Sequence, residues 1–129
     1  MINLVIQILS INKINLIKYK YSNVTLKIKG TGNKNVYTST QWLTDFPNEV
    51  FIKEEKQNDI SPKYDFVDEE TTVKLVWYNN IKYGACIFCI CQDITEIDFS
   101  DFDTSDMTYM GWMFWGDNIY NYFFRFISF

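Results

Sequence analysis

The stretch ITEIDFSDFDTSDMTYMGWMF, Ile94–Phe114, has the most informative pattern in the sequence. It begins with apolar residues spaced as on a short strand: Ile94, Ile97, Phe99 and Phe102. A polar turn follows at residues 103–106. The second apolar set has the three-to-four residue spacing of a helical or 3₁₀ return, and comprises Met107, Met110, Met113 and Phe114. The stretch therefore predicts a strand, a turn and a return.

The same pattern starts again further along the chain. A shift of twenty-five positions from the first apolar set lands on four more apolar residues: Ile119, Tyr122, Phe124 and Ile127. An aromatic turn is also repeated, because Tyr83, Ile87 and Phe88 align with Tyr109, Met113 and Phe114, in a second copy that is one residue shorter. This spacing lies within the period of leucine-rich repeats, about 20–29 residues. It predicts a repeat-type interaction surface.

Composition excludes several classes of function. The chain has 129 residues, 47% of them apolar and 19% aromatic, which is enough for a packed core. Its net charge of −4 disfavours a nucleic-acid or anionic-membrane partner, which would attract a basic surface.

No transmembrane segment is predicted, since the apolar run in residues 1–20 is shorter than the roughly 20 residues that a span needs. That run is interpreted as an extra strand or helix, with a signal-peptide remnant as the alternative.

The sequence contains no histidine, and this argues against an enzyme. Histidine is the commonest general base and metal ligand, so Ser-His and Cys-His pairs are excluded. The carboxylate pairs Glu54–Glu55 and Glu69–Glu70 could serve a small hydrolase. Adjacent residues point to opposite faces of a strand, however, and these pairs are typical of turns. We expect no catalytic residues and no cofactor.

Residues 21–80 have the pattern of antiparallel strands. Val24, Leu26 and Ile28 alternate with polar residues, and so do Val73, Leu75 and Trp77. Between them, residues 30–33 predict a turn, 36–39 and 49–53 predict strands, 54–59 predict a polar hairpin or loop, and 64–66 predict another strand. The strand spacing predicts a small sandwich or barrel. The triplet beginning at Asn23 is a glycosylation sequon, for which an ordinary strand start is the simpler interpretation.

All three cysteines lie in one short run, Cys86, Cys89 and Cys91. Three thiolates could hold zinc, but a tetrahedral site needs a fourth ligand, and the nearest carboxylate is Asp93. The apolar neighbours of these cysteines favour buried thiols, because free cysteine is among the most buried residue types. A redox or disulfide role is the other alternative.

The stretch Ile94–Phe114 and its flanks resemble the BspA-like leucine-rich repeat family of surface proteins. Repeats of that family read approximately L-T-x-L-D-L-S-N-F-D-T-S-N-V-T-N-M-x-x-M-F-x-G-C, and the most specific matches here are Phe102–Ser105 and Met113–Gly116. The sequence departs from this pattern at Ile90, which replaces a glycine, and at Asp117, which replaces a cysteine. After Ile119 only the apolar spacing is kept, and residues 125–129 match none of the S-N-F-D-T-S identities. The resemblance covers residues 81–129, with one intact and two partial units.

The predicted fold class is therefore mainly β with an α/β repeat. A small N-terminal antiparallel β-sandwich-like domain over residues 21–80 would precede the start of a leucine-rich-repeat solenoid over residues 81–129. A boundary is expected near residue 80. The apolar run Ile119–Phe129 would be an edge prone to self-association, which suggests a fragment or truncated member of the family.

An outward acidic face is the candidate protein-binding site. Glu96, Asp98 and Ser100 alternate with the apolar strand positions, and Asp101 follows them. Such a face could select a basic partner or divalent cations. The simpler alternative is that these residues fit the repeat pattern and keep a solenoid soluble.

The resemblance implies that the chain is a non-enzymatic protein-interaction module of a surface or secreted protein. Some members of the family have an adhesive role. Its protein ligand would bind the strand face of the repeats. No convincing signal peptide supports that location. A decayed or truncated structural paralogue, with no binding activity of its own, is the alternative function.

Overall fold

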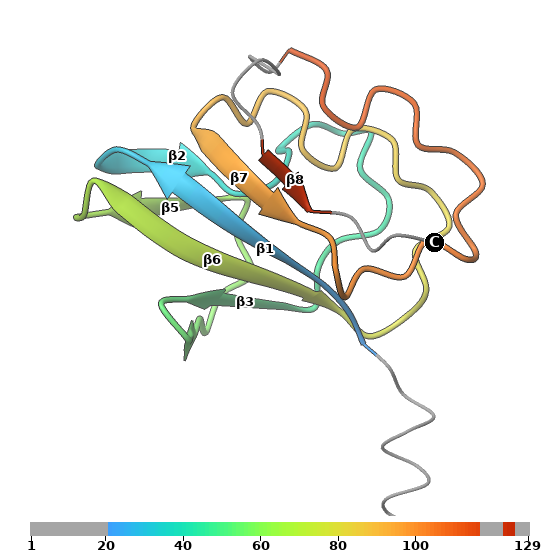
Figure 1. Ribbon diagram of the computed structural model, residues 1–129, viewed down its shortest axis with the longest axis horizontal. Helices are drawn as coiled ribbons and strands as arrows, with labels where there is room; N and C mark the ends of the chain where they lie inside the picture. The colour runs from blue at the N-terminus through green and yellow to red at the C-terminus, as the bar shows by residue number, and fades with distance from the viewer. Residues whose placement is uncertain (1–20, 117–122, 126–129) are drawn as a thin grey trace, which may run out of the picture.

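The computed structural model describes residues 21–116 and 123–125 of the chain (Figure 1). Its strands are β1 (Ser22–Lys29), β2 (Gly32–Asn35), β3 (Glu49–Ile52), β4 (Glu55–Lys56), β5 (Lys63–Phe66), β6 (Glu70–Trp77), β7 (Ile94–Asp98) and β8 (Phe123–Arg125). No helix occurs in these residues, so none of them forms a segment able to cross a membrane as a helix. The mainly β class predicted from the sequence is confirmed.

Six strands form the larger sheet, in the order β4-β3-β6-β1-β7-β8 (Figure 1). Neighbours in this sheet are antiparallel, except that β7 and β8 run parallel. The strands β2 and β5 pair separately as a second antiparallel sheet. The antiparallel part of the prediction is therefore confirmed.

The long strands β1 and β6 form the centre of the large sheet. Leu26 lies opposite Val73 and Val24 lies opposite Leu75, and all four are fully buried. Alternation of period two places every second side chain on one face, and each buried aliphatic side chain contributes about 1.5–3 kcal/mol. The polar residues between them face the other side of the sheet. The alternation seen in the sequence thus gives the correct buried face for both strands.

A bulge in β7 explains the uneven apolar spacing at the start of the repeat-like stretch. Lys27 is paired with Glu96, whereas the next residue, Ile28, is paired with Ile94, so the register shifts between them. A bulge absorbs one extra residue and restores the alternation beyond it. Ile94 and Ile97 are therefore both buried, although they are three positions apart.

One hydrophobic core lies against the buried face of the large sheet. Segments without regular secondary structure cover this face, and their buried side chains include Tyr37, Ile87, Phe88, Phe102 and Met113. The boundary predicted near residue 80 lies between β6 and the segment leading to β7. The same core contains residues from both sides of that position.

Two details of the predicted secondary structure are wrong. Residues 107–116 form turns rather than a helical return, and the positive φ of Trp112, 61°, is incompatible with a continuing right-handed helix. The strand predicted at 36–39 lies earlier, at β2, because the turn closes at Gly30–Thr31. The hairpin predicted as one alternative for residues 54–59 is confirmed, since β4 pairs with β3.

The predicted repeat distance is also wrong for the strands. Ile97 is paired with Phe124, a separation of 27 residues (124 − 97) rather than 25. The predictions for residues 1–20 and for self-association through Ile119–Phe129 fall outside the described residues, apart from the backbone of β8.

Candidate interaction surface

The predicted acidic residues lie on and just after β7, but most of them are engaged within the chain. The Nζ of Lys27 lies 3.2 Å from a carboxylate oxygen of Glu96, as an ion pair between neighbouring strands. Asp98 accepts hydrogen bonds from the backbone N–H of Ser100, at 2.9 Å, and from its hydroxyl. This is the turn-stabilising role that aspartate commonly has.

Asp101 differs from the other three predicted residues because its side chain is exposed. Its backbone carbonyl accepts a hydrogen bond of 3.1 Å from the N–H of Asn23, which fixes the turn after β7 against β1. Its carboxylate has no hydrogen-bond or ion-pair partner within residues 21–116. Of the predicted acidic face, Asp101 is therefore the group best placed to meet another molecule.

The sheet places basic and hydroxyl side chains beside these acids, which the sequence pattern alone did not indicate. Phe51, Lys74, Thr25 and Asp98 lie opposite one another in a row across β3, β6, β1 and β7. Directly opposed residues share a face of the sheet. The outer face is therefore of mixed charge rather than acidic.

A hollow of about 370 Å³ occupies part of this outer face. Its lining combines one aromatic ring with four polar side chains: Thr25, Phe51, Glu54, Thr72 and Lys74. From the alternation in the sequence of β1 and β6, the side chains of Thr25, Thr72 and Lys74 could have been predicted to face outward. Which strands are neighbours is a tertiary property, so the hollow itself could not be found from the sequence.

Two turn segments next to the sheet repeat one conformation. The first turn segment is residues 81–91 and the second turn segment is residues 107–116. Cys86 and Trp112 both have a φ of 61°, and twenty-six residues separate them (112 − 86). Ile90 and Gly116 are equally spaced and also have positive φ, 61° and 82°. The aromatic turns aligned in the sequence thus have the same backbone shape.

Parallel hydrogen bonds join the two turn segments side by side. The N–H groups of Gly84, Phe88 and Ile90 donate to the carbonyls of Tyr109, Met113 and Trp115 at 2.8, 3.0 and 3.0 Å. A Cβ at Gly84 would lie 2.5 Å from the sulfur of Met107, so the flexible Met107 side chain would have to move to admit a larger residue.

Equivalent aromatic rings stack between the turn segments. The ring centroids of Tyr83 and Tyr109 are 5.2 Å apart, and those of Phe88 and Phe114 are 5.8 Å apart with an interplanar angle of 8°. Both distances lie in the favourable range for aromatic pairs. The alignment of Tyr83 with Tyr109 in the sequence is confirmed as a spatial contact.

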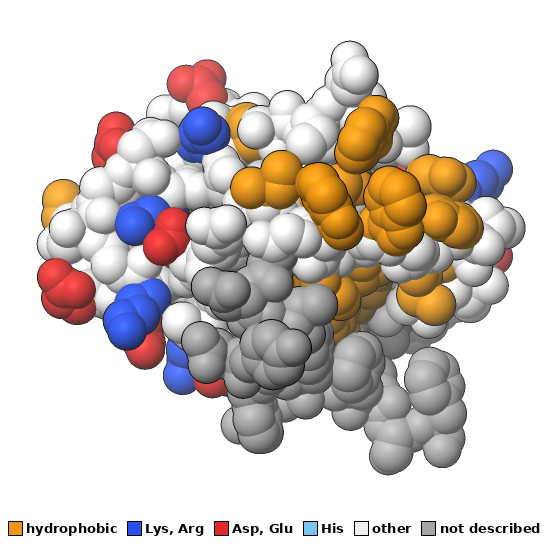
Figure 2. Space-filling view, turned by 90° about the horizontal axis from the view of Figure 1, so that it is seen from above, with side chains coloured by type: hydrophobic (Ala, Val, Ile, Leu, Met, Phe, Trp, Pro, Cys, Tyr) orange, Lys and Arg blue, Asp and Glu red, His pale blue; other side chains and the backbone are white. Residues whose placement is uncertain are grey.

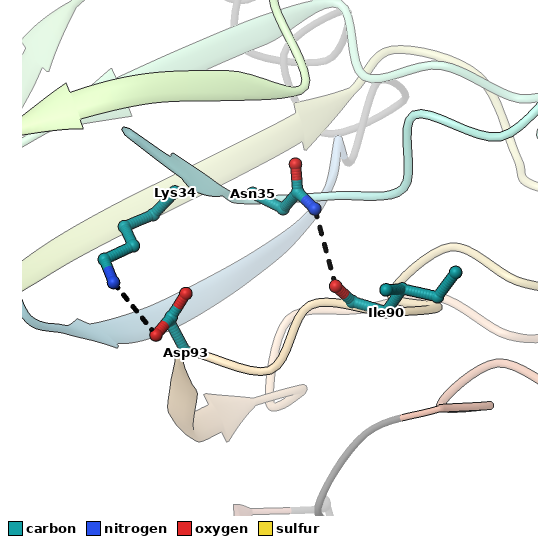
Figure 3. Close-up of polar contacts among 4 residues, drawn as sticks. All are labelled: Lys34, Asn35, Ile90 and Asp93. Carbon is teal, nitrogen blue, oxygen red and sulfur yellow. Dashed lines mark hydrogen bonds and ion pairs between the residues drawn. The ribbon is translucent and has the colours of Figure 1, made fainter. Parts of the chain in front are cut away.

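The strand β2 ties the first turn segment to the small sheet (Figure 3). Lys34 forms an ion pair of 3.1 Å with Asp93, and the side-chain amide of Asn35 donates to the carbonyl of Ile90 at 3.4 Å. The other end of the Asn35 amide points away from Ile90, and its buried Oδ1 accepts no hydrogen bond from the residues that the structure describes. These contacts hold the turn in place.

The cysteines are not three free thiols as the sequence interpretation favoured. Cys86 and Cys89 form a disulfide within the first turn segment, and Cys91 is a buried thiol. The positive φ of Cys86 brings the two Cα atoms to 4.7 Å, a separation that a disulfide can bridge. In the described part of the chain, no three cysteine or carboxylate side chains are grouped as a metal site requires.

The carboxylate pairs considered for hydrolysis lie in two different turns of the large sheet. Glu54 is in the turn between β3 and β4, where its φ is 69°, and Glu69 directly precedes β6. All four members of the two pairs are exposed. The structure brings neither pair into a buried site.

Comparisons with known proteins identify no relative. No protein-family model, no curated protein and no solved structure matches this chain.

Proposed function

We propose that this chain is a non-enzymatic protein-interaction module related to BspA-like leucine-rich repeat surface proteins. The observation that carries the proposal is the parallel stacking of the two turn segments, twenty-six residues apart, with Tyr83 on Tyr109. Stacked units of one shape are the building principle of repeat proteins, which use extended surfaces to bind other proteins. In this proposal the parallel strands β7 and β8 belong to successive units of a short solenoid.

The outer face of the large sheet is the proposed binding surface. It is solvent-exposed, it contains the hollow beside Phe51, and it carries charges of both signs. An aromatic side chain in a hollow with polar groups around it is a typical anchor point of a protein interface. The partner would insert an apolar side chain against Phe51, and Asp101 would meet a basic group at the rim.

The disulfide supports a surface or secreted location for the protein. Disulfides persist in oxidising compartments and are rare in the reducing cytosol. Cys86 and Cys89 lie in the turn segment that the resemblance includes. The resemblance and the disulfide therefore favour the same location.

Binding to a panel of purified extracellular-matrix proteins, measured by biolayer interferometry, tests this function. We expect saturable binding to at least one of them, and Phe51→Ala should weaken it by about tenfold or more, as for a central aromatic anchor. Phe46→Ala is the matched control, because Phe46 is exposed but lies outside the hollow. Circular dichroism would verify that both variants are folded.

Two outcomes would count against the proposal. An absence of binding across the panel would favour the alternative, a structural paralogue without binding activity. An equal loss of binding in the Phe51 and Phe46 variants would exclude the outer face as the binding surface.

A further inference from the structure

We propose that Tyr83 and Tyr109 form an oxidative modification site, at which a haem peroxidase with hydrogen peroxide joins the two phenol rings as dityrosine. The new bond links the first turn segment to the second within one chain. Partner binding and this cross-link are different properties of the protein. The binding test of the proposed function and the test of this site can therefore fail separately.

The backbone holds the two tyrosines next to each other. Tyr83 and Tyr109 form a parallel bridge. The N–H of Gly84 donates to the carbonyl of Tyr109 at 2.8 Å, and the N–H of Thr108 donates to the carbonyl of Lys82 at 3.0 Å. Groups held together in this way react as if they were highly concentrated. Coupling within one chain is therefore expected to exceed coupling between chains in dilute solution.

The two rings are close and nearly parallel. Their centroids are 5.2 Å apart, and the interplanar angle is 19°. Dityrosine forms when a carbon next to the hydroxyl-bearing carbon of one ring bonds to the corresponding carbon of the other. Exposed side chains change rotamer in picoseconds to nanoseconds, so the stacked rings can bring these carbons into contact.

Gly111 gives the Tyr109 ring its place in the second turn segment. A Cβ built at Gly111 would clash with the hydroxyl oxygen of Tyr109, so this oxygen occupies space that a larger residue would fill. The phenol of Tyr109 therefore lies over Gly111 while its ring stacks on Tyr83. This contact makes the position of the ring adjustable by a substitution that keeps both phenols.

An oxidant can reach both rings from solvent. Tyr83 is 43% exposed and Tyr109 is 44% exposed, whereas Tyr37 is 2% exposed and is expected to stay unmodified. Figure 2 shows hydrophobic side chains, a class that includes tyrosine in its key, gathered on one side of the molecule. The disulfide between Cys86 and Cys89 lies in the first turn segment and is typical of oxidising compartments. Exposure and compartment are both compatible with oxidation at this pair.

The reaction consumes one hydrogen peroxide for each cross-link. Each phenol gives up one electron and one proton and becomes a tyrosyl radical. The two radicals couple by forming a carbon–carbon bond, and the hydrogens of the two joined carbons then move to the oxygens. The peroxide accepts the two electrons and two protons and becomes two molecules of water. The product therefore keeps both hydroxyl groups and has lost two hydrogen atoms.

Peptide mapping by mass spectrometry, after treatment of the full chain with a haem peroxidase and hydrogen peroxide, tests the proposal. Cleavage at acidic residues separates position 83 from position 109 unless the two are joined, since Asp93 and Asp106 are among the acidic residues between them. We expect a linked pair of peptides, lighter by two hydrogen atoms, in protein that still has the mass of a monomer.

Three variants show which features direct the coupling. Tyr109→Phe should abolish the link. Tyr21→Phe is the matched control, because Tyr21 is 48% exposed and its ring centroid lies 4.9 Å from that of Tyr78, outside the turn segments. Gly111→Ala should lower the yield of the link, because the added methyl group moves the Tyr109 ring away from its place on Tyr83.

Four results would overturn the proposal. They are a wild-type chain without the link while free tyrosine in the same reaction is coupled, links formed only between chains, an unchanged yield in Gly111→Ala, and an equal loss in Tyr21→Phe. If Tyr109→Phe fails to fold, as judged by circular dichroism, the map of wild type decides. A link between positions 83 and 109 then supports the site, and its absence overturns it.

Discussion

Ile90 shows how a single residue departs from both the repeat pattern and ordinary backbone geometry. The BspA-like pattern that the sequence resembles has glycine at this position, and the equivalent residue in the second turn segment is Gly116. The φ of Ile90 is 61°, in a region that costs a residue with a Cβ roughly 1–2 kcal/mol and is especially unfavourable for a β-branched one. The hydrogen bonds of its N–H to Trp115 and of its carbonyl with Asn35 hold this conformation.

Ile90→Asn should therefore stabilise the protein. Asparagine adopts positive φ readily, so we expect the free energy of unfolding to rise by about 1 kcal/mol in chemical denaturation. Ile60→Asn is the control, because Ile60 is similarly exposed but has no positive φ. A loss of stability in the Ile90 variant as large as in the Ile60 variant would show that the backbone strain is negligible.

Among the structural elements, the segment between β2 and β3, residues 36–48, contributes buried side chains to the core as the strands do. Tyr37 is its largest buried side chain, and the neighbouring Thr38 donates its N–H to the carbonyl of Ile87 at 2.8 Å. The segment thus packs between the sheet and the first turn segment. Burial, together with the nearby Tyr64, raises the pKa of Tyr37 from 10.0 to about 12.

This packing predicts a loss of stability in alkali that depends on Tyr37. A tyrosine whose pKa is higher in the folded state keeps its proton there while the unfolded chain loses it. The contribution of Tyr37 to the free energy of unfolding is complete below pH 10. It falls by up to roughly 2 kcal/mol as the pH rises toward about 12. The stability of Tyr37→Phe should therefore decline less over this range, as measured by urea denaturation. Parallel decline in both proteins would mean that Tyr37 ionises normally.

The elements also show what the sequence could and could not predict. Alternation correctly identified the buried faces of β1 and β6, because each is long and has one face against the core. The bulge in β7 was not predicted, since uneven spacing fits both a bulged strand and a repeat pattern. The helical return was wrong because Met107, Met110 and Met113 suggest helical spacing, whereas hydrogen bonds between turn segments fix the backbone.

At the scale of the molecule, the candidate site was only partly accessible from the sequence. The positions of Glu96 and Asp98 on β7 follow from alternation. The pairing of Glu96 with Lys27 does not, because sixty-nine residues separate them (96 − 27) and only the sheet order brings them together. For the same reason, the hollow around Phe51 and Lys74 emerges only once β3, β6 and β1 are placed side by side.

The proposed function depends on the parallel stacking of the two turn segments, twenty-six residues apart. The double variant Tyr83→Cys with Tyr109→Cys tests it, since these residues form a parallel bridge. Residues paired across a parallel bridge are close enough for cysteines at their positions to form a disulfide, whereas Cα atoms more than about 7 Å apart cannot be joined.

The measurement is peptide mapping by mass spectrometry after mild oxidation, with Tyr83→Cys and Trp115→Cys as the control pair. We predict a cross-link between positions 83 and 109 within one chain, and none between 83 and 115. A folded protein that fails to join 83 to 109, or that joins both pairs equally, would contradict the stacking and the repeat-based function inferred from it.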